Sequence, residues 1–277
     1  MGASSYRVRV GALTLRCVSW GEPDDPPVVL LHGAGVHAHW WQALVPSLLP
    51  GWRLLAPDLR GHGESDWAHA PYLIEHFSDD LSGLLDGLGV RRVVLIGHSM
   101  GGRVTAWFAA HHPERVAGVA LLDTRMAGLK PERVDQWRGV TIGEGPRRTY
   151  ATRDAAIAAF RVVPPESGIA TTVLADLAEH AVTQLNSGEW ALCFDRDVLR
   201  LEASRLADVF HLLSRIRCPA VVMKGEASTV ITPAECAATA AALGDCPVHV
   251  FPGGHHFPLV QPAAVGAVLR GFVERVR

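Results

Sequence analysis

One short stretch of the chain carries residues whose types and spacing suit covalent chemistry. It begins with the apolar run 93–96 and continues, ahead of a helical pattern, with Gly97, His98, Ser99, Met100, Gly101 and Gly102. A strand that reverses sharply into a helix needs residues without bulk on both sides of the turn, and Gly97 and Gly101 meet that need. Such a turn exposes the Ser99 hydroxyl beside the unpaired N–H groups that open the helix. The stretch therefore predicts a nucleophilic serine next to donors for an oxyanion.

Around this serine, short apolar runs alternate with helical patterns. The chain opens with two alternating segments, 6–10 and 13–20, on either side of Gly11, and they predict a β-hairpin. Further apolar runs follow at 28–31, 54–56, 93–96, 119–122, 221–223 and 248–251. Most of them are separated by amphipathic helical patterns, such as 81–88. This alternation predicts an α/β protein with a mostly parallel central sheet flanked by helices.

Between residues 125 and 213 the alternation disappears. The pattern there is almost wholly helical, with an alanine-rich helix at 154–160 and a second apolar face at 173–185. Open α/β sheets bind ligands at the carboxyl ends of their strands, and a helical insertion between two strands suits a lid over that end. We therefore expect a core in two parts, 1–124 and 214–277, with a helical cap at 125–213.

Further motifs accompany the serine. The segment 32–35, HGAG, follows the third predicted strand, the segment 58–65, DLRGHGES, follows the fourth, and a histidine pair lies near the C-terminus. With the turn at Ser99, these motifs resemble the α/β-hydrolase family over nearly the whole chain. The resemblance implies the α/β-hydrolase fold and the catalytic order serine, acid, histidine. In such a triad the histidine takes the serine proton and the carboxylate orients the histidine.

Two neighbouring histidines, His255 and His256, are candidates for the base. They lie between the last predicted strand and the last predicted helix. The family commonly has a Gly-His pair here, with a proline seven residues beyond the histidine. Gly254, His255 and Pro262 satisfy that spacing, whereas His256 lies six residues before the proline. We favour His255 and keep His256 as the alternative.

The acid departs from the usual family pattern. G-x-x-D commonly follows the penultimate strand, but this chain has Gly225 to Ser228 there, with serine where aspartate is expected. Two carboxylates are candidates instead: Glu226 in the same loop, and Asp123 at the end of the run 119–122. Some family members carry the acid after that earlier strand, and in this respect the chain resembles zearalenone lactonases. We favour Asp123, with Glu226 or no acid as alternatives, since an aspartate at a strand end also caps turns.

Backbone N–H groups form the oxyanion hole in this family. One comes from the residue after the nucleophile and one from the loop after the third strand. In this sequence the resemblance assigns them to Met100 and Ala34. We expect Gly33 and Gly35 to let that loop come close, and His32 to orient it rather than to act in catalysis.

Composition argues against several other classes of protein. The net charge is −2 and the basic residues form no stripe, so nucleic acid is not an expected partner. The start of the chain lacks a signal-peptide pattern, and no segment approaches the roughly 18 unbroken apolar residues of a membrane span. We therefore expect a soluble, cytoplasmic protein. The 5 cysteines are scattered without zinc-binding spacing, and we expect neither a metal nor another cofactor.

These residues and the resemblance predict a serine hydrolase that cleaves a small or medium, mainly apolar ester or lactone through an acyl-enzyme on Ser99. Related proteins use the same triad to hydrolyse a carbon–carbon bond next to a ketone or to run a lyase reaction, and both are alternatives. A receptor-like binding module with a mobile cap and little turnover is another. The serine argues against dehalogenases and epoxide hydrolases, which have aspartate there. Neither the substrate nor the oligomeric state can be predicted from the sequence.

Overall fold

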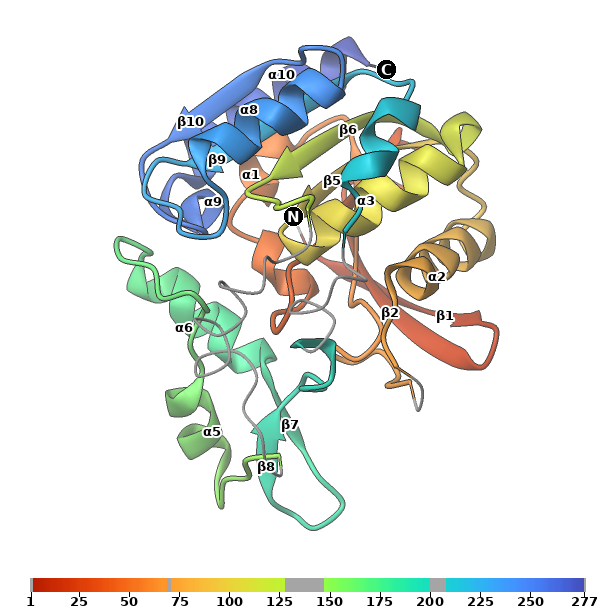
Figure 1. Ribbon diagram of the computed structural model, residues 1–277. Helices are drawn as coiled ribbons and strands as arrows, with labels where there is room; N and C mark the ends of the chain where they lie inside the picture. Colours follow the sequence, from red (N-terminus) through yellow and green to blue (C-terminus); the bar gives the residue numbers. More distant parts are fainter. Residues whose placement is uncertain (1, 69–70, 128–146, 200–207, 277) are drawn as a thin grey trace.

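The computed structural model describes residues 2–68, 71–127, 147–199 and 208–276, and within them a single eight-stranded sheet forms the centre of the molecule (Figure 1). Its strands, in sheet order, are β1 (Ser4–Val10), β2 (Leu13–Trp20), β4 (Arg53–Pro57), β3 (Pro27–Leu31), β5 (Val93–His98), β6 (Val116–Leu122), β9 (Ala220–Gly225) and β10 (Val248–Phe251). β1 pairs antiparallel with β2, and β2 pairs antiparallel with β4. All pairs from β4 to β10 are parallel. The predicted hairpin and mostly parallel sheet are confirmed.

Helices cover both faces of this sheet. Along β3 and β5, neighbouring apolar residues alternate between two core clusters, which explains why these strands are continuously apolar in sequence. One cluster includes α2 (Ile74–Gly87), α3 (Met100–His111), α8 (Pro233–Ala242) and the 3-10 helix η4 (Phe210–Arg215). The other includes the 3-10 helix η1 (Ala38–Trp41), α1 (Val45–Leu48), α9 (Phe257–Val260) and α10 (Pro262–Arg275). A short 3-10 turn, η2 (Pro113–Arg115), leads into β6.

The chain between β6 and β9 leaves the sheet. Before η4, its described elements are α5 (Arg153–Ala159), α6 (Thr171–His180), β7 (Val182–Gln184) and β8 (Trp190–Leu192). They appear in green and teal at the lower left of Figure 1, apart from the sheet. Two parts of the expected cap, 128–146 and 200–207, lie outside the described residues. The division of the chain at 124 and 213 stays a prediction.

The described part of this insertion is less helical than its sequence pattern indicates. The predicted apolar helix face at 173–185 is helical only to His180, because β7 and β8 then form an antiparallel hairpin. A turn closed by hydrogen bonds between Leu185 and both Gly188 and Glu189 joins the two strands. Gly188 adopts a φ of 87°, which glycine reaches without steric cost. In its described residues the segment is therefore not almost wholly helical as expected, because the spacing of apolar residues does not indicate where this turn falls.

No helix in the described part of the chain is long and apolar enough to cross a membrane.

Candidate active site

Ser99 occupies a sharp turn between β5 and α3. Its φ of 54° and ψ of −118° lie in a region that residues other than glycine rarely adopt. The turn is tight on both sides, since a Cβ at Gly97 would collide with the carbonyl of Gly101, and a Cβ at Gly101 with the carbonyl of Leu31. Helix α3 begins at Met100, so its unpaired N–H groups open beside Ser99. The strand, turn and helix expected around Ser99 are therefore present.

Asp123 and His255 form a buried hydrogen bond. The distance between His255 Nδ1 and Asp123 Oδ2 is 2.7 Å, and the two residues are 6% and 0% exposed. A carboxylate only accepts hydrogen bonds, so Nδ1 carries the proton and Nε2 is the basic nitrogen of the neutral ring. This is the tautomer that a histidine needs in order to accept a proton from a serine.

The loop after β9 supplies further donors to Asp123. The N–H of Gly225 donates to Oδ1 at 3.0 Å, and the hydroxyl of Ser228 donates to Oδ2. Ser228 stands where the family usually has aspartate, and here its side chain supports a carboxylate that comes from the neighbouring strand β6. Glu226, the alternative acid, is exposed to solvent. The structure thus places Asp123, rather than Glu226, against His255.

His98 connects the loop of His255 to the turn of Ser99. Its Nε2 donates to the carbonyl of His255 at 2.9 Å, and the two ring centroids are 4.5 Å apart. Because His98 directly precedes Ser99, this bond holds the histidine loop beside the serine. Burial, with the neighbouring histidines, puts the His98 pKa well below its ordinary value, so the ring is neutral. Sequence reasoning missed His98, although a polar residue at the end of an otherwise apolar strand was a usable signal.

The loop that carries Ala34 runs along the serine turn. A Cβ on Gly33 would lie 3.2 Å from the Cβ of Ser99, which requires glycine or a small shift at this position. Ala34 is half-buried, whereas Met100 on the other side of Ser99 is fully buried. The structure therefore places the loop that carries Ala34 beside the turn from which Met100 begins α3.

Two buried histidines brace this loop. His32 accepts from the N–H of Leu59 at 3.0 Å and donates through Nδ1 to the Gly33 carbonyl at 2.7 Å. His62 accepts from the N–H of Gly35 at 3.1 Å and donates to a carbonyl of its own segment. Burial lowers the pKa of His32 to about 3 and that of His62 to about 4. Both rings are therefore neutral and orient the main chain. His62 was not singled out from the sequence.

Neutral buried histidines make the fold sensitive to acid. Burial, as the main cause, lowers the pKa values of His32 and His256 to about 3 and that of His62 to about 4. In the unfolded chain these rings titrate near 6.5, so between about pH 6.5 and pH 4 the unfolded state binds protons that the folded state does not. Each ring then removes about 1.4 kcal/mol of stability per pH unit. We expect the thermal unfolding midpoint to fall steeply on acidification below about pH 6.5.

Unfolding scans between about pH 8 and pH 5 measure this effect. His62→Gln should flatten the pH dependence, whereas His111→Gln, at an exposed position, should leave its slope unchanged. A midpoint that does not move over this range would contradict neutral burial of these rings.

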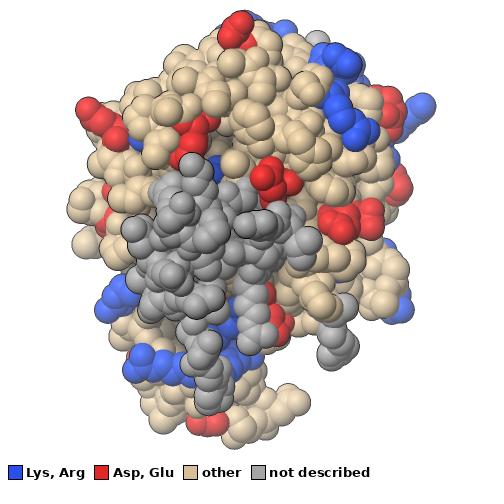
Figure 2. Space-filling model, in the orientation of Figure 1, with Lys and Arg blue, Asp and Glu red and all other residues tan. Residues whose placement is uncertain are grey.

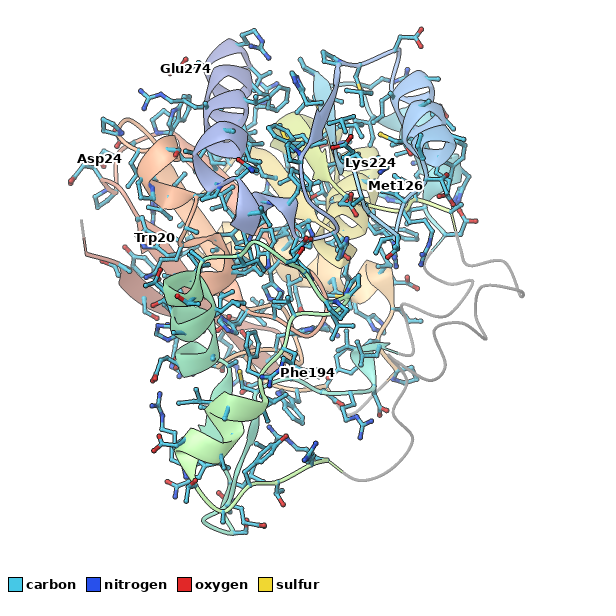
Figure 3. All side chains as sticks on the ribbon, turned by 90° about the vertical axis from the view of Figure 1, so that its left-hand side faces the viewer. Trp20, Asp24, Met126, Phe194, Lys224 and Glu274 are labelled. Atoms are coloured by element: carbon cyan, nitrogen blue, oxygen red, sulfur yellow. The ribbon has the colours of Figure 1, made fainter. Side chains whose placement is uncertain are left out.

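The insertion meets the core beside this site. The N–H of Gly63 donates to the carbonyl of Cys193, and the N–H of Asp195 donates to the carbonyl of Gly61, at 2.7 Å each. Phe194 lies between these two insertion residues, where the insertion joins the core (Figure 3). The insertion is therefore anchored to the loop after β4, at the carboxyl end of the sheet.

In the described part of the chain no group of three His, Cys, Asp or Glu side chains is arranged to hold a metal ion.

Known proteins share this architecture. A family model described as alpha/beta hydrolase fold matches residues 26–155. The chain is 28% identical to a serine hydrolase-like protein of Danio rerio, over 98% of this chain and 89% of that protein. It is 26% identical to 3-oxoadipate enol-lactonase 2 of Acinetobacter baylyi, over 95% of this chain and 94% of that protein. The solved structure of E-2-(acetamidomethylene)succinate hydrolase matches with a TM-score of 0.86 and 25% identity, over 99% of this chain and 100% of the other.

The matches extend over the sheet, the serine turn and the insertion alike. Full-length similarity to hydrolases at 25–28% identity goes with the same fold, but it leaves the substrate open. The resemblance to zearalenone lactonases in the placement of the acid stays a prediction. With its parallel sheet and its sharp turn between β5 and α3, the chain has the α/β-hydrolase fold.

Proposed function

We propose that this protein is a serine hydrolase that cleaves a small or medium, mainly apolar ester or lactone through an acyl-enzyme on Ser99. The observation that carries the proposal is the buried 2.7 Å hydrogen bond between His255 and Asp123. His98, the residue before Ser99, bonds to the carbonyl of the same histidine, and Ser99 itself is held at a φ of 54°. Similarity to an enol-lactonase over 95% of the chain supports a lactone as one substrate class.

In the proposed first step, the Oγ of Ser99 attacks the carbonyl carbon of the substrate. His255 Nε2 takes the hydroxyl proton, and Asp123 stabilises the imidazolium that forms. The negative charge that develops on the carbonyl oxygen is accepted by the N–H groups of Met100 and Ala34. When the tetrahedral intermediate collapses, the imidazolium returns its proton to the leaving alcohol oxygen, and the acyl group stays on Ser99.

The second step repeats this chemistry with water. His255 Nε2 removes a proton from a water molecule, which attacks the acyl carbon and displaces the Ser99 oxygen. The serine recovers its proton from the imidazolium, and the carboxylic acid leaves. The insertion at 125–213 is proposed as the cap that shields the acyl-enzyme from bulk water and shapes the acyl pocket. Phe194, at the junction with the core, is a described residue of that insertion.

A substrate panel tests the proposal. Purified protein and Ser99→Ala are assayed with short and medium esters, five- and six-membered lactones, and vinylogous diketones. Repeated release of acid from an ester or lactone, absent in Ser99→Ala, is expected. Turnover only of diketones would move the reaction to carbon–carbon bond hydrolysis on the same triad. Stoichiometric binding without turnover of any compound would favour the receptor-like module.

The two histidines should separate by experiment. His255→Ala removes the ring that Asp123 orients, so we expect turnover to fall by several orders of magnitude. His256 instead donates from Nε2 to the carbonyl of Val163 at 3.2 Å, in the insertion. His256→Ala should therefore mainly change stability or the Michaelis constant. Initial rates and unfolding midpoints of both variants measure this contrast, and the opposite ranking would assign the base to His256.

A small-molecule substrate in the cytoplasm, without nucleic-acid or membrane partners, is part of the same proposal. On the face shown in Figure 2, basic and acidic side chains are interspersed over the described surface, and the net charge is −2. A surface on which the two charges are mixed offers no continuous basic patch that a polyanion such as nucleic acid could bind. Cell fractionation and a nucleic-acid binding assay at low salt test these points, and retention on either membranes or DNA would contradict them.

A further inference from the structure

A carboxylate from the insertion holds the loop of His255. Glu166 lies between α5 and α6, and its Oε1 accepts from the N–H of Gly254 at 3.0 Å. Its Oε2 accepts from the N–H of His256 at 2.9 Å. These two residues flank His255, so both oxygens of one side chain fix the main chain on either side of the ring. Two charge-assisted bonds to one carboxylate restrict orientation more strongly than one bond does.

The two segments are in close contact along this stretch. A Cβ on Gly254 would come 2.8 Å from Oε2 of Glu166, so the absence of a side chain there lets the carboxylate approach. One step further, the ring of His256 donates to the carbonyl of Val163 in the same insertion segment. A Cβ on Gly168 would lie 3.3 Å from Val260 in α9. The insertion therefore runs alongside the histidine loop, and Glu166 is the residue through which a charged side chain of the insertion contacts that loop.

The core supports other atoms of the same loop. Asp123 binds the His255 ring, and His98 binds the His255 carbonyl. The carbonyl of Gly253 accepts from the N–H of Ala227 at 2.9 Å. Glu166 satisfies the N–H groups on either side of His255. Without its carboxylate, these part-buried N–H groups would lose their acceptors, and a donor left without a partner away from water costs stability.

We infer that Glu166 is a positioning residue, which keeps the His255 ring aimed between Asp123 and Ser99 only while the insertion is docked on the core. The inference rests on the proposed function, because it assigns the base a support that comes from the cap. Its consequence is that formation of a competent base depends on the insertion as well as on the core. A cap that leaves its docked position would release the histidine loop and stop acylation.

Removing one acceptor oxygen tests this role. Glu166→Gln keeps the size of the side chain but directs an NH₂ group at one of the two N–H donors. We expect the rate of acylation, followed as phosphonylation of Ser99 by a serine-directed fluorophosphonate, to fall about ten- to a hundredfold, the effect of losing a charge-assisted hydrogen bond. The Michaelis constant should change by less than about twofold if the substrate pocket is not involved. The far-downfield proton resonance of His255 Nδ1–H should shift or broaden.

Two further variants make the test selective. Gly254→Ala perturbs the same contact from the other partner, because its Cβ displaces the end of the Glu166 side chain, and it should reproduce the slower labelling and the altered resonance. Glu179→Gln is the matched control: it lies in α6 of the same insertion, in an exposed ion pair with Arg153, and should behave like the unsubstituted protein.

The outcomes separate this inference from the proposed function. A wild-type protein that is not labelled at Ser99 would overturn the proposed function, while the His255 resonance still reports on Glu166. Normal labelling of the wild type, with the same rate and the same resonance in Glu166→Gln and Gly254→Ala, would overturn the role of Glu166 alone. Loss of activity in Glu166→Gln that only parallels a lowered unfolding midpoint, with an unshifted resonance, would also overturn it.

Discussion

Replacing Ser99 with alanine should lower turnover by roughly 10⁴- to 10⁶-fold, the range found when the nucleophile of a catalytic triad is removed. The substitution deletes one hydroxyl oxygen and keeps a Cβ, so the backbone strain at a φ of 54° is the same in both proteins. Because Ser99 is only half-buried, the loss of packing is small. Initial rates on the best substrate of the panel, measured over several enzyme concentrations, give the size of the effect.

A matched serine substitution serves as the control. Ser187 lies in the exposed turn between β7 and β8, far along the chain from the serine turn. The variant Ser187→Ala should retain full turnover. Circular dichroism should show the same unfolding midpoint for Ser99→Ala and the wild type within a few degrees. A folded Ser99→Ala protein with near-normal turnover would end the case for covalent catalysis at this residue.

Replacing Asp123 with asparagine should lower turnover by about 10⁴-fold, as expected when the triad carboxylate becomes an amide and the histidine takes the wrong tautomer. Asparagine tolerates the left-handed backbone that Asp123 adopts, with a φ of 45°, so the fold should be retained. Glu226→Gln, at an exposed position in the loop after β9, should be far milder. Rates and unfolding midpoints must be measured together, because Asp123 is fully buried and a folding defect would mimic a catalytic one.

A second substitution tests whether activity can be restored. The hydroxyl of Ser228 reaches the same carboxylate oxygen of Asp123 that His255 binds. A carboxylate at position 228 is therefore within reach of the imidazole, and Ser228→Asp should restore part of the activity of Asp123→Asn. A folded, active Asp123→Asn protein together with a folded, inactive Glu226→Gln protein would move the acid to the later loop. The resemblance to zearalenone lactonases would then lose its main support.

The parts of the fold that follow from short-range constraints were predictable. The turn at Ser99 is one example, since the backbone passes too close on either side for any residue but glycine at positions 97 and 101. The apolar runs of β3 and β5 are another, because burial on both faces removes the polar alternation of an exposed strand. Both features are encoded within a few residues.

The choices between neighbouring candidates were not encoded locally. His255 and His256 are adjacent, yet one ring meets Asp123 across 132 positions of sequence and the other meets Val163 across 93. Spacing from Pro262 favoured His255, but only the position of β6 beside β9 shows which ring the carboxylate reaches. Glu166 gave no signal at all, because its partners are main-chain N–H groups that every sequence offers. The hairpin of the insertion was missed for a related reason, since apolar residues at helical spacing also occur where a turn intervenes.

Labelling with a serine-directed fluorophosphonate, followed by intact-mass measurement and peptide mapping, tests the central claim most directly, because it reports the activated nucleophile without knowledge of the substrate. We expect a single adduct per chain, located on Ser99, absent in Ser99→Ala and strongly slowed in Asp123→Asn and His255→Ala. An adduct on another residue, or the absence of any adduct in a preparation that still turns over an ester or lactone, would contradict a triad built on Ser99.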